Sequence, residues 1–370
     1  MEESIDMGQT GISTGALSKQ QSSVESRAIY AALVGGGIGF LVGLLVFWSG
    51  DVALFERGRV SLGFVATILG SVTALVTYLV VALREQKARE TLWQYIRRTV
   101  SVWSLALTHG LLAFLLYALV FYVVSQSFIG AHIDTGSAAT LTALSTGLAA
   151  YVVYLSAATM TAMRVSMLLA LFLVSGTFLS MLTASNPFWW DDHFSSLGAG
   201  GGVSGYAFNA TLIIAGLVIV ALSKYIADDF KKLQQDGRVS ERVKVRAVQT
   251  ILAGIGLALA GVGLFVYNEF PTIHNTAAAG MAVLFLGIVA VLPWVTPGFT
   301  KAFFVASYGL LVSLLVSVWL FLGIGYFNLT VFELVAAAII FVWLVLFVRH
   351  TAALLGDMVI ARNVKKGVEE

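Results

Sequence analysis

The chain of 370 residues contains no cysteine and only four prolines, and few of its residues are charged. Without cysteine it can form no disulfide and offers no thiolate to a metal or a substrate. Lys, Arg, Asp and Glu together make up 11% of the chain, whereas hydrophobic residues make up 58%. The core of a water-soluble domain cannot hide so much apolar surface, so the composition indicates a protein whose main solvent is lipid.

Several catalytic motifs are absent as well. No lysine follows the glycine spacing of a P-loop, so we expect no nucleotide to be bound or hydrolysed by that route. The sequence also contains no His-Glu-x-x-His zinc helix and no Gly-x-Ser-x-Gly nucleophile elbow. The prolines all lie at or near the ends of apolar stretches, at positions Pro187, Pro271, Pro293 and Pro297.

Ten stretches are long and apolar enough to cross a bilayer as helices, each of which needs ~20 mostly apolar residues. They cover residues 28–48, 60–83, 100–126, 138–160, 165–184, 206–226, 247–267, 276–294, 302–322 and 331–348. The predicted fold class is therefore all-α, a polytopic membrane bundle of about ten transmembrane helices. Such helices satisfy their backbone polar groups internally, as lipid requires.

The positive charges lie almost entirely on one side of these spans. With ten spans the two termini share a side, and 20 of the 22 Lys and Arg residues fall on that side. Only Arg57 and Arg59 fall on the other. Since the side rich in Lys and Arg is usually cytoplasmic, we expect a multi-pass protein of the plasma membrane with both termini in the cytoplasm. The basic residues are spread over several short connectors, so they indicate topology and no nucleic-acid partner.

Composition and motifs divide the chain into four segments. Residues 1–27 are polar and predict a disordered cytoplasmic tail. Residues 28–164 predict an N-terminal region of four membrane helices, residues 165–348 a six-helix membrane core, and residues 349–370 a basic cytoplasmic tail.

Small residues recur at four-residue spacing in two of the spans. They are Gly35, Gly39 and Gly43 in the first span, and Gly254 with Ala258 and Gly256 with Ala260 in the seventh. This spacing lets helices approach closely, and we interpret it as packing within the chain.

Residues capable of chemistry gather in three connectors on the expected outer face. The longest connector contains Asp191, Asp192, His193 and Ser196, the second contains Glu269 and His274, and the third contains His132 and Asp134. Imidazole and carboxylate groups together can bind a divalent metal or exchange a proton in acid–base catalysis. These connectors are therefore the candidate site.

The same residues also have structural interpretations. Trp189 and Trp190 fit an interfacial aromatic belt, and His193 and Ser195 can cap the next helix or fold the loop onto itself. Within the spans the notable polar residues are His109, Asn209 and Glu333. Glu333 lies near the outer end of its span, where it can reach water, and His109 can bond to a neighbouring helix.

The last six spans carry several short motifs in a particular order. The order is a loop with His-x-x-Ser-Leu-Gly, a span opening with Phe-Asn, a Gly-rich span that ends in Phe-Pro, and then a histidine; the residues are His193, Ser196, Leu197, Gly198, Phe208, Asn209, Gly216, Gly261, Gly263, Phe270, Pro271 and His274. This pattern resembles the bacterial membrane family called "domain of unknown function 998", over about residues 165–348. It is distantly similar to the eukaryotic group of damage-regulated autophagy modulators and a GPI-anchor lipid-remodelling factor.

The resemblance implies work on lipid at the outer leaflet, with His193, Ser196, Asn209 and His274 as the signature positions. The favoured interpretation is therefore a protein that handles a lipid or a cell-envelope precursor at the outer membrane face. The catalytic candidates are His193, His274, Ser196 and Asp192; the substrate-binding candidates are Asn209, Trp190 and Glu269; and a divalent metal, if used, would be held by His193, His274 and Asp191. We expect the two histidines to approach one another despite the residues between them.

Two other interpretations stay open. Ten spans suit a transporter or permease subunit built from two inverted repeats of five, although no internal repeat is evident. A non-catalytic membrane scaffold or sensor is the third. Polar groups gathered at the outer boundary would favour the lipid interpretation, whereas a polar cavity in mid-membrane would favour transport. The expected partners are the lipid bilayer and, for the favoured interpretation, a lipid or envelope-precursor substrate.

Overall fold

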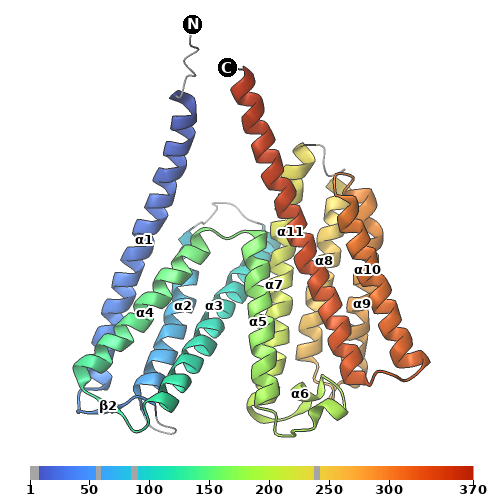
Figure 1. Cartoon of the computed structure of the whole chain (residues 1–370). Helices are drawn as coiled ribbons and strands as arrows, with labels where there is room; N and C mark the ends of the chain where they lie inside the picture. Colours follow the sequence, from blue (N-terminus) through green and yellow to red (C-terminus); the bar gives the residue numbers. More distant parts are fainter. Residues whose placement is uncertain (1–7, 56–59, 85–90, 237–241, 370) are drawn as a thin grey trace. The chain divides into compact units, whose positions relative to one another are not determined.

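The computed structural model of the chain describes residues 8–55, 60–84, 91–236 and 242–369 (Figure 1). This part of the chain contains eleven α-helices and two short strands, and ten of the helices are long and apolar enough to cross a membrane. The expected all-α polytopic fold and its ten spans are confirmed. Arg57 and Arg59, the only cations expected on the outer side, lie outside the described residues.

The ten long helices follow the expected spans in order. They are α1 (Gly8–Val46), α2 (Leu62–Arg84), α3 (Leu92–Ser127), α4 (Thr135–Ala158), α5 (Ala162–Leu182), α7 (Gly202–Gln235), α8 (Arg242–Leu264), α9 (Pro271–Val295), α10 (Lys301–Val318) and α11 (Leu329–Glu369). The short elements are β1 (Val52–Ala53), β2 (His132–Ile133), α6 (Ser196–Ala199), a 3₁₀ turn at Trp189–Asp191 and a π-helical turn at Trp319–Gly323.

Three helices extend well past the spans that hydropathy predicts. α1 begins at Gly8, within the polar segment of residues 1–27, and residues 1–7 lie outside the described part. α7 runs to Gln235, and α11 continues through the basic tail to Glu369. None of these extensions contains proline. Once a span has formed a helix, each added residue gains a hydrogen bond without a new nucleation step.

The chain forms two compact units. Unit 1 comprises residues 1–89 and 105–160, and unit 2 comprises residues 90–104 and 161–370. The boundary between Met160 and Thr161 lies close to the division expected at residue 164, but the start of α3 belongs to unit 2.

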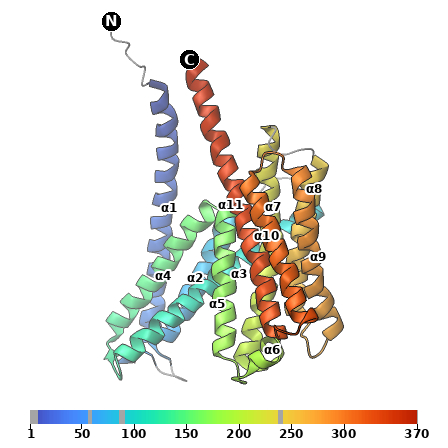
Figure 2. The same cartoon turned by 45° about the vertical axis from the view of Figure 1, so that its right-hand side comes forward.

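In unit 1 the helix α1 packs along α4, and α2 also packs on α4 (Figures 1 and 2). The small residues of α1 make this contact close: Gly35 faces Ala150 and Gly43 faces Ala139. The expected role of these glycines in packing within the chain is confirmed. At the end of the unit where α1 ends and α4 begins, β1 and β2 pair antiparallel, with Val52 opposite Ile133.

In unit 2 the central helix is α7, which is the most buried of the spans and packs on α5, α8 and α11. Gly256 of α8 lies against Gly216 and Val220 of α7, so the two backbones approach closely. The helix α9 packs on the other side of α8, and Gly254 faces Leu284 there. The small residues predicted to mediate packing in this span therefore do so.

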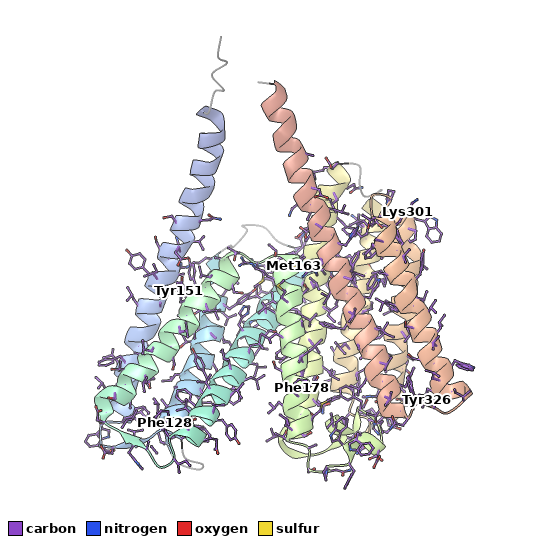
Figure 3. All side chains as sticks on the ribbon, in the orientation of Figure 1. Phe128, Tyr151, Met163, Phe178, Lys301 and Tyr326 are labelled. Atoms are coloured by element: carbon purple, nitrogen blue, oxygen red, sulfur yellow. The ribbon has the colours of Figure 1, made fainter. Side chains whose placement is uncertain are left out.

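The connectors of unit 2 fall at two opposite ends. Residues 183–201, 265–270 and 324–328 lie at the end that carries α6, called here the α6 end (Figure 1). In Figure 3 Phe178 and Tyr326 lie toward this end, and Met163 and Lys301 lie toward the other. The three connectors hold most of the candidate residues of this unit. Asn209 lies in α7, and His274, which was expected in a connector, lies in the first turn of α9.

Candidate functional site

The connector before α7 folds into a compact segment over the α6 end; we call residues 186–201 the cap segment. Its own hydrogen bonds shape it: Asn186 Oδ1 accepts from the N–H of Phe188 at 2.9 Å, and Ser196 Oγ donates to Trp189 O at 3.1 Å. Asn209 of α7 donates from Nδ2 to Gly198 O at 2.9 Å. Ser196 and Asn209, two of the predicted site residues, therefore hold the cap segment in its fold.

Apolar contacts anchor the cap segment to the helices below it. Leu197 and Phe208 are buried in one cluster with Leu212 and Val262, and Phe194 packs edge-on against Phe208 with ring centroids 5.1 Å apart. These contacts direct Ser195, which follows Phe194 in the cap segment, inward, and Ser195 is only 7% exposed.

Ser195 lies between a histidine and a carboxylate from two different helices. Its Oγ is 3.0 Å from Nε2 of His274 on α9 and 3.4 Å from Oε1 of Glu333 on α11. His274 is 3% exposed. Three elements that are far apart in the sequence thus meet at one hydroxyl.

The hydrogen bonds of His274 assign its tautomer. Its Nδ1 lies 2.9 Å from the carbonyl oxygen of Phe265, just beyond the end of α8. A carbonyl oxygen only accepts, so Nδ1 carries the proton, and in the neutral ring Nε2 is left as the acceptor. The Ser195 hydroxyl has one proton, which it can donate either to Nε2 at 3.0 Å or to Glu333 Oε1 at 3.4 Å. Donation to Nε2 is the arrangement required for a base to take the proton.

Glu333 ties the cap segment to α11. Its Oε2 accepts from the backbone N–H of Phe194 at 2.6 Å and from that of Ser195 at 3.3 Å. Of the two alternatives for this carboxylate, a functional role or mere contact with water, the second does not apply, because the cap segment folds over it. Asn328, just before α11, makes a second tie, in which its Nδ2 donates to Trp190 O at 3.3 Å.

His193 lies beside the same site. Its ring packs on Tyr267 at a centroid distance of 4.3 Å, and the same Tyr267 ring contacts His274 at 5.7 Å. The prediction that His193 and His274 approach one another is confirmed. Burial lowers the pKa of His193; the neighbouring Asp192 opposes this shift, and His274 adds to it. The Nδ1 atom of His193 is buried and has no hydrogen-bond partner.

The other candidates lie at the rim of the α6 end. Asp191, Asp192, Trp190 and Glu269 are all exposed, and Asp192 acts on His193 through its charge. Across the part of the chain that is described, no three His, Asp or Glu side chains gather in a way that could hold a metal ion. The proposed metal ligands His193, His274 and Asp191 therefore do not form a metal-binding group here.

The remaining candidates belong to unit 1. His109 is buried and hydrogen-bonded through Nδ1 to Leu105 O at 2.7 Å and through Nε2 to Ser156 Oγ of α4 at 2.9 Å, in agreement with a bond to a neighbouring helix. His132 lies in β2 and is exposed. Asp134 caps α4 by accepting from the N–H of Ser137, and the hydroxyl of Ser137 holds its pKa below the usual value.

Sequence patterns indicated Ser195 only as a cap or loop-folding residue and Glu333 only as a polar residue within a span, and they did not join the two in one site. Ser195 stands beside Ser196 without a motif of its own, and Glu333 is separated from it by 138 positions. Only the inward side of the cap segment and the position of α11 distinguish them. The resulting group can move a proton between Ser195 and His274 and can stabilise a positive imidazole through Glu333.

Comparison with known proteins agrees with the motifs. Residues 167–350 match the model of a family described as "Protein of unknown function (DUF998)", and this range contains the cap segment, His274 and Glu333. No curated protein and no solved structure matches the chain. This integral membrane protein therefore belongs, over residues 167–350, to the family described as "Protein of unknown function (DUF998)".

Proposed function

We propose that this protein acts on a lipid or a cell-envelope precursor at the outer face of the plasma membrane. The observation that carries the proposal is the hydroxyl of Ser195 at 3.0 Å from Nε2 of His274, whose Nδ1 is held by Phe265 O. A serine placed in this way beside a neutral imidazole is the minimum arrangement for nucleophilic acyl chemistry.

The reaction that this pair supports is the hydrolysis or transfer of an acyl group. Ser195 Oγ would attack the carbonyl carbon of an ester while its proton passes to Nε2 of His274. The imidazolium would then return this proton to the departing alcohol. A water or a second alcohol would next attack the acyl group on Ser195 and lose its proton to His274. The imidazolium would return this proton to the departing Ser195 Oγ as the product is released.

Glu333 supports the same chemistry through charge. Its carboxylate contacts Ser195, which in turn contacts His274, so a negative charge faces the imidazolium that forms during the reaction. An opposite charge at this range favours the protonated ring. Glu333 also fixes the backbone at Phe194 and Ser195 and so positions the nucleophile.

The location of the site favours work at a membrane surface. The polar groups gather where helices end, under the cap segment, whereas transporters place their sites near the bilayer midplane at the interface of two repeats. The distribution of Lys and Arg supports an outward position for this end, with both termini cytoplasmic. The resemblance to lipid-remodelling proteins supports a lipid or a lipid-linked substrate.

The test is lipid and envelope-precursor profiling of a deletion strain complemented with variants. Ser195→Ala and His274→Gln should each reduce turnover by ~10²–10⁴-fold, because each removes half of the proton-transfer pair. Ser185→Ala is the matched control, since Ser185 is an exposed serine at the same end of the unit. If Ser195→Ala restores the wild-type profile, the proposed chemistry is wrong. A change in solute uptake with an unaltered lipid profile would instead identify a transporter, and no change in either a scaffold.

A further inference from the structure

We propose that the cap segment and the start of α11 bind a neutral, hydroxyl-bearing head group through His193 Nδ1 and Thr330 Oγ1. This inference rests on the proposed function and names the class of substrate that the site takes. It adds two residues to the site that do not belong to the reacting pair.

The first observation is a pair of buried polar atoms without partners. His193 Nδ1 and Thr330 Oγ1 are both shielded from solvent and make no hydrogen bond, and the Thr330 side chain is only 3% exposed. Buried polar groups are nearly always hydrogen-bonded, and each exception requires an explanation. A ligand that supplies the missing partners is one such explanation.

The second observation places His193 and Thr330 on two segments that hydrogen bonds join into one strip. Asn328, just before α11, bonds to Trp190 O, and Glu333 of α11 bonds to the backbone of Phe194 and Ser195. The start of α11 therefore runs alongside residues 190–195 in the same direction. Thr330 lies between these two ties on α11, and His193 lies between them on the cap segment.

The third observation is the charge around this strip. The connectors 183–201, 265–270 and 324–328 contain no Lys or Arg, so no cationic side chain of theirs would pair with a phosphate. Asp191 and Asp192 are exposed, and Glu333 is engaged with the cap segment, since Oε2 accepts from two backbone N–H groups and Oε1 contacts Ser195 Oγ. A buried cation would therefore lack a free carboxylate, and an unpaired buried charge is strongly unfavourable.

A hydroxyl group satisfies all three conditions. It is neutral, and it can both donate and accept, so it suits a ring nitrogen and a threonine hydroxyl in either state. The contact with the Tyr267 ring fixes the plane of the His193 imidazole ring, so Nδ1 of His193 has a defined direction. A sugar or another polyol head group offers several such hydroxyls close together.

A ligand role predicts two effects of opposite sign. Thr330→Val keeps the shape of the side chain and removes an unpaired hydroxyl, so it should raise the thermal midpoint of the ligand-free protein. The same change should weaken head-group binding by ~5–10-fold, the equivalent of one hydrogen bond. His193→Phe keeps the ring on Tyr267 and should weaken binding to a similar extent. A purely structural threonine would show a lower midpoint on substitution.

The experiment uses the purified full chain in phosphatidylcholine nanodiscs that contain monoglucosyl diacylglycerol, phosphatidylglycerol or phosphatidylethanolamine. Retention of each lipid is measured by native mass spectrometry for the wild type, Thr330→Val, His193→Phe and the control Thr272→Val, whose residue is exposed at the start of α9. We expect the glucosyl lipid to bind best and Thr272→Val to bind as the wild type does. Preferred binding of phosphatidylglycerol or phosphatidylethanolamine, or unaltered binding by both site variants, would overturn the inference.

Ser195→Ala separates this inference from the proposed function. If both hold, this variant retains the glucosyl lipid and loses turnover. If Ser195→Ala keeps turnover while Thr330→Val loses the lipid, the head-group site is supported and the acyl chemistry is refuted. If Ser195→Ala loses turnover while Thr330→Val binds the lipid normally, the acyl chemistry is supported and the head-group site is refuted.

Discussion

Glu333 is the residue on which the position of the cap segment depends most directly. A carboxylate has only acceptor atoms, and its partners here are two backbone N–H groups and one hydroxyl. The residue lies in the second turn of α11, so the tie connects a loop to a membrane helix. The geometry of the Ser195–His274 pair depends on this tie as well as on the apolar anchor at Leu197.

Glu333→Gln should loosen the cap segment. The neutral amide oxygen of glutamine is a weaker acceptor than a carboxylate oxygen, so the two hydrogen bonds from the backbone N–H groups of Phe194 and Ser195 to this side chain both weaken. We expect the free energy of unfolding to fall by about 1–3 kcal/mol. Chemical unfolding in detergent measures this change, and hydrogen exchange should show faster exchange at these two amides. Glu269→Gln, at an exposed carboxylate of the same end, should change stability by less than about 0.5 kcal/mol. Equal exchange in wild type and Glu333→Gln would contradict the role of the tie.

His193 should make stability depend on pH. Burial lowers its pKa below the ordinary value of 6.5, so near and below that pH the unfolded chain binds a proton that the folded chain does not. The free energy of unfolding then rises with pH in this range. The contribution is fully present above pH 6.5 and is lost as the pH falls toward the lower pKa of the folded state. His193→Phe should reduce the slope in a pH series of unfolding measurements. A slope identical to that of the wild type would show that His193 titrates alike in both states.

The pairing of α7 with α8 is the closest helix contact that supports the site. A side chain at Gly256 would meet Gly216 O at 2.5 Å and Val220 N at 2.9 Å, so the two backbones meet without an intervening side chain. α7 carries Asn209, which holds the cap segment, and α8 leads to Phe265 and Tyr267, which orient the two histidines. The spacing of these helices therefore sets the spacing of the site.

Gly256→Ala should destabilise unit 2. The added methyl group meets backbone atoms, which cannot move aside as a flexible side chain can, and such overpacking costs about 1–3 kcal/mol. Gly287→Ala on α9 is the matched control, because a methyl group there meets nothing within 4 Å. We expect the control to retain wild-type stability or to gain up to ~1 kcal/mol from better helix propensity. Thermal unfolding of both variants in one detergent compares them, and equal losses would refute the packing argument.

The ten spans give the chain its orientation in the bilayer. Connectors alternate between the two sides, so the cap segment and the α7–α8 connector fall on opposite sides. The Lys and Arg distribution then predicts that the cap segment faces outward. The proposed work on an outer-leaflet substrate requires this orientation.

Cysteine labelling tests this orientation without interference, since the chain has no cysteine of its own. Asp191→Cys, in the exposed part of the cap segment, should react with an impermeant reagent in intact cells. Gln235→Cys, at the exposed end of α7, should react only after the membrane is opened. The reverse pattern would place the site on the cytoplasmic side and exclude an outer-leaflet substrate.

The membrane fold could be predicted almost completely from the sequence. Each span must form its backbone hydrogen bonds within one continuous apolar segment. Its position therefore depends on local composition, which hydropathy detects. The extensions of α1, α7 and α11 were not predicted, because these polar residues continue a helix outside lipid and hydropathy does not detect them. The close packing at Gly35 and Gly256 could be predicted, because small residues at four-residue spacing occupy one face of a helix.

The site was predicted only in part. That two histidines share one end follows from the order of spans, and the structure places both on Tyr267. Which serine faces His274 depends on how the cap segment turns: Ser195 points inward, whereas Ser196 bonds to Trp189. Whether Glu333 reaches water or the cap depends on the position of α11 relative to residues distant in the chain. The sequence by itself determines the membrane spans, because long apolar segments are a local property of the chain. The site is decided by the tertiary structure, because contacts between distant side chains exist only after the helices and the cap segment have packed together.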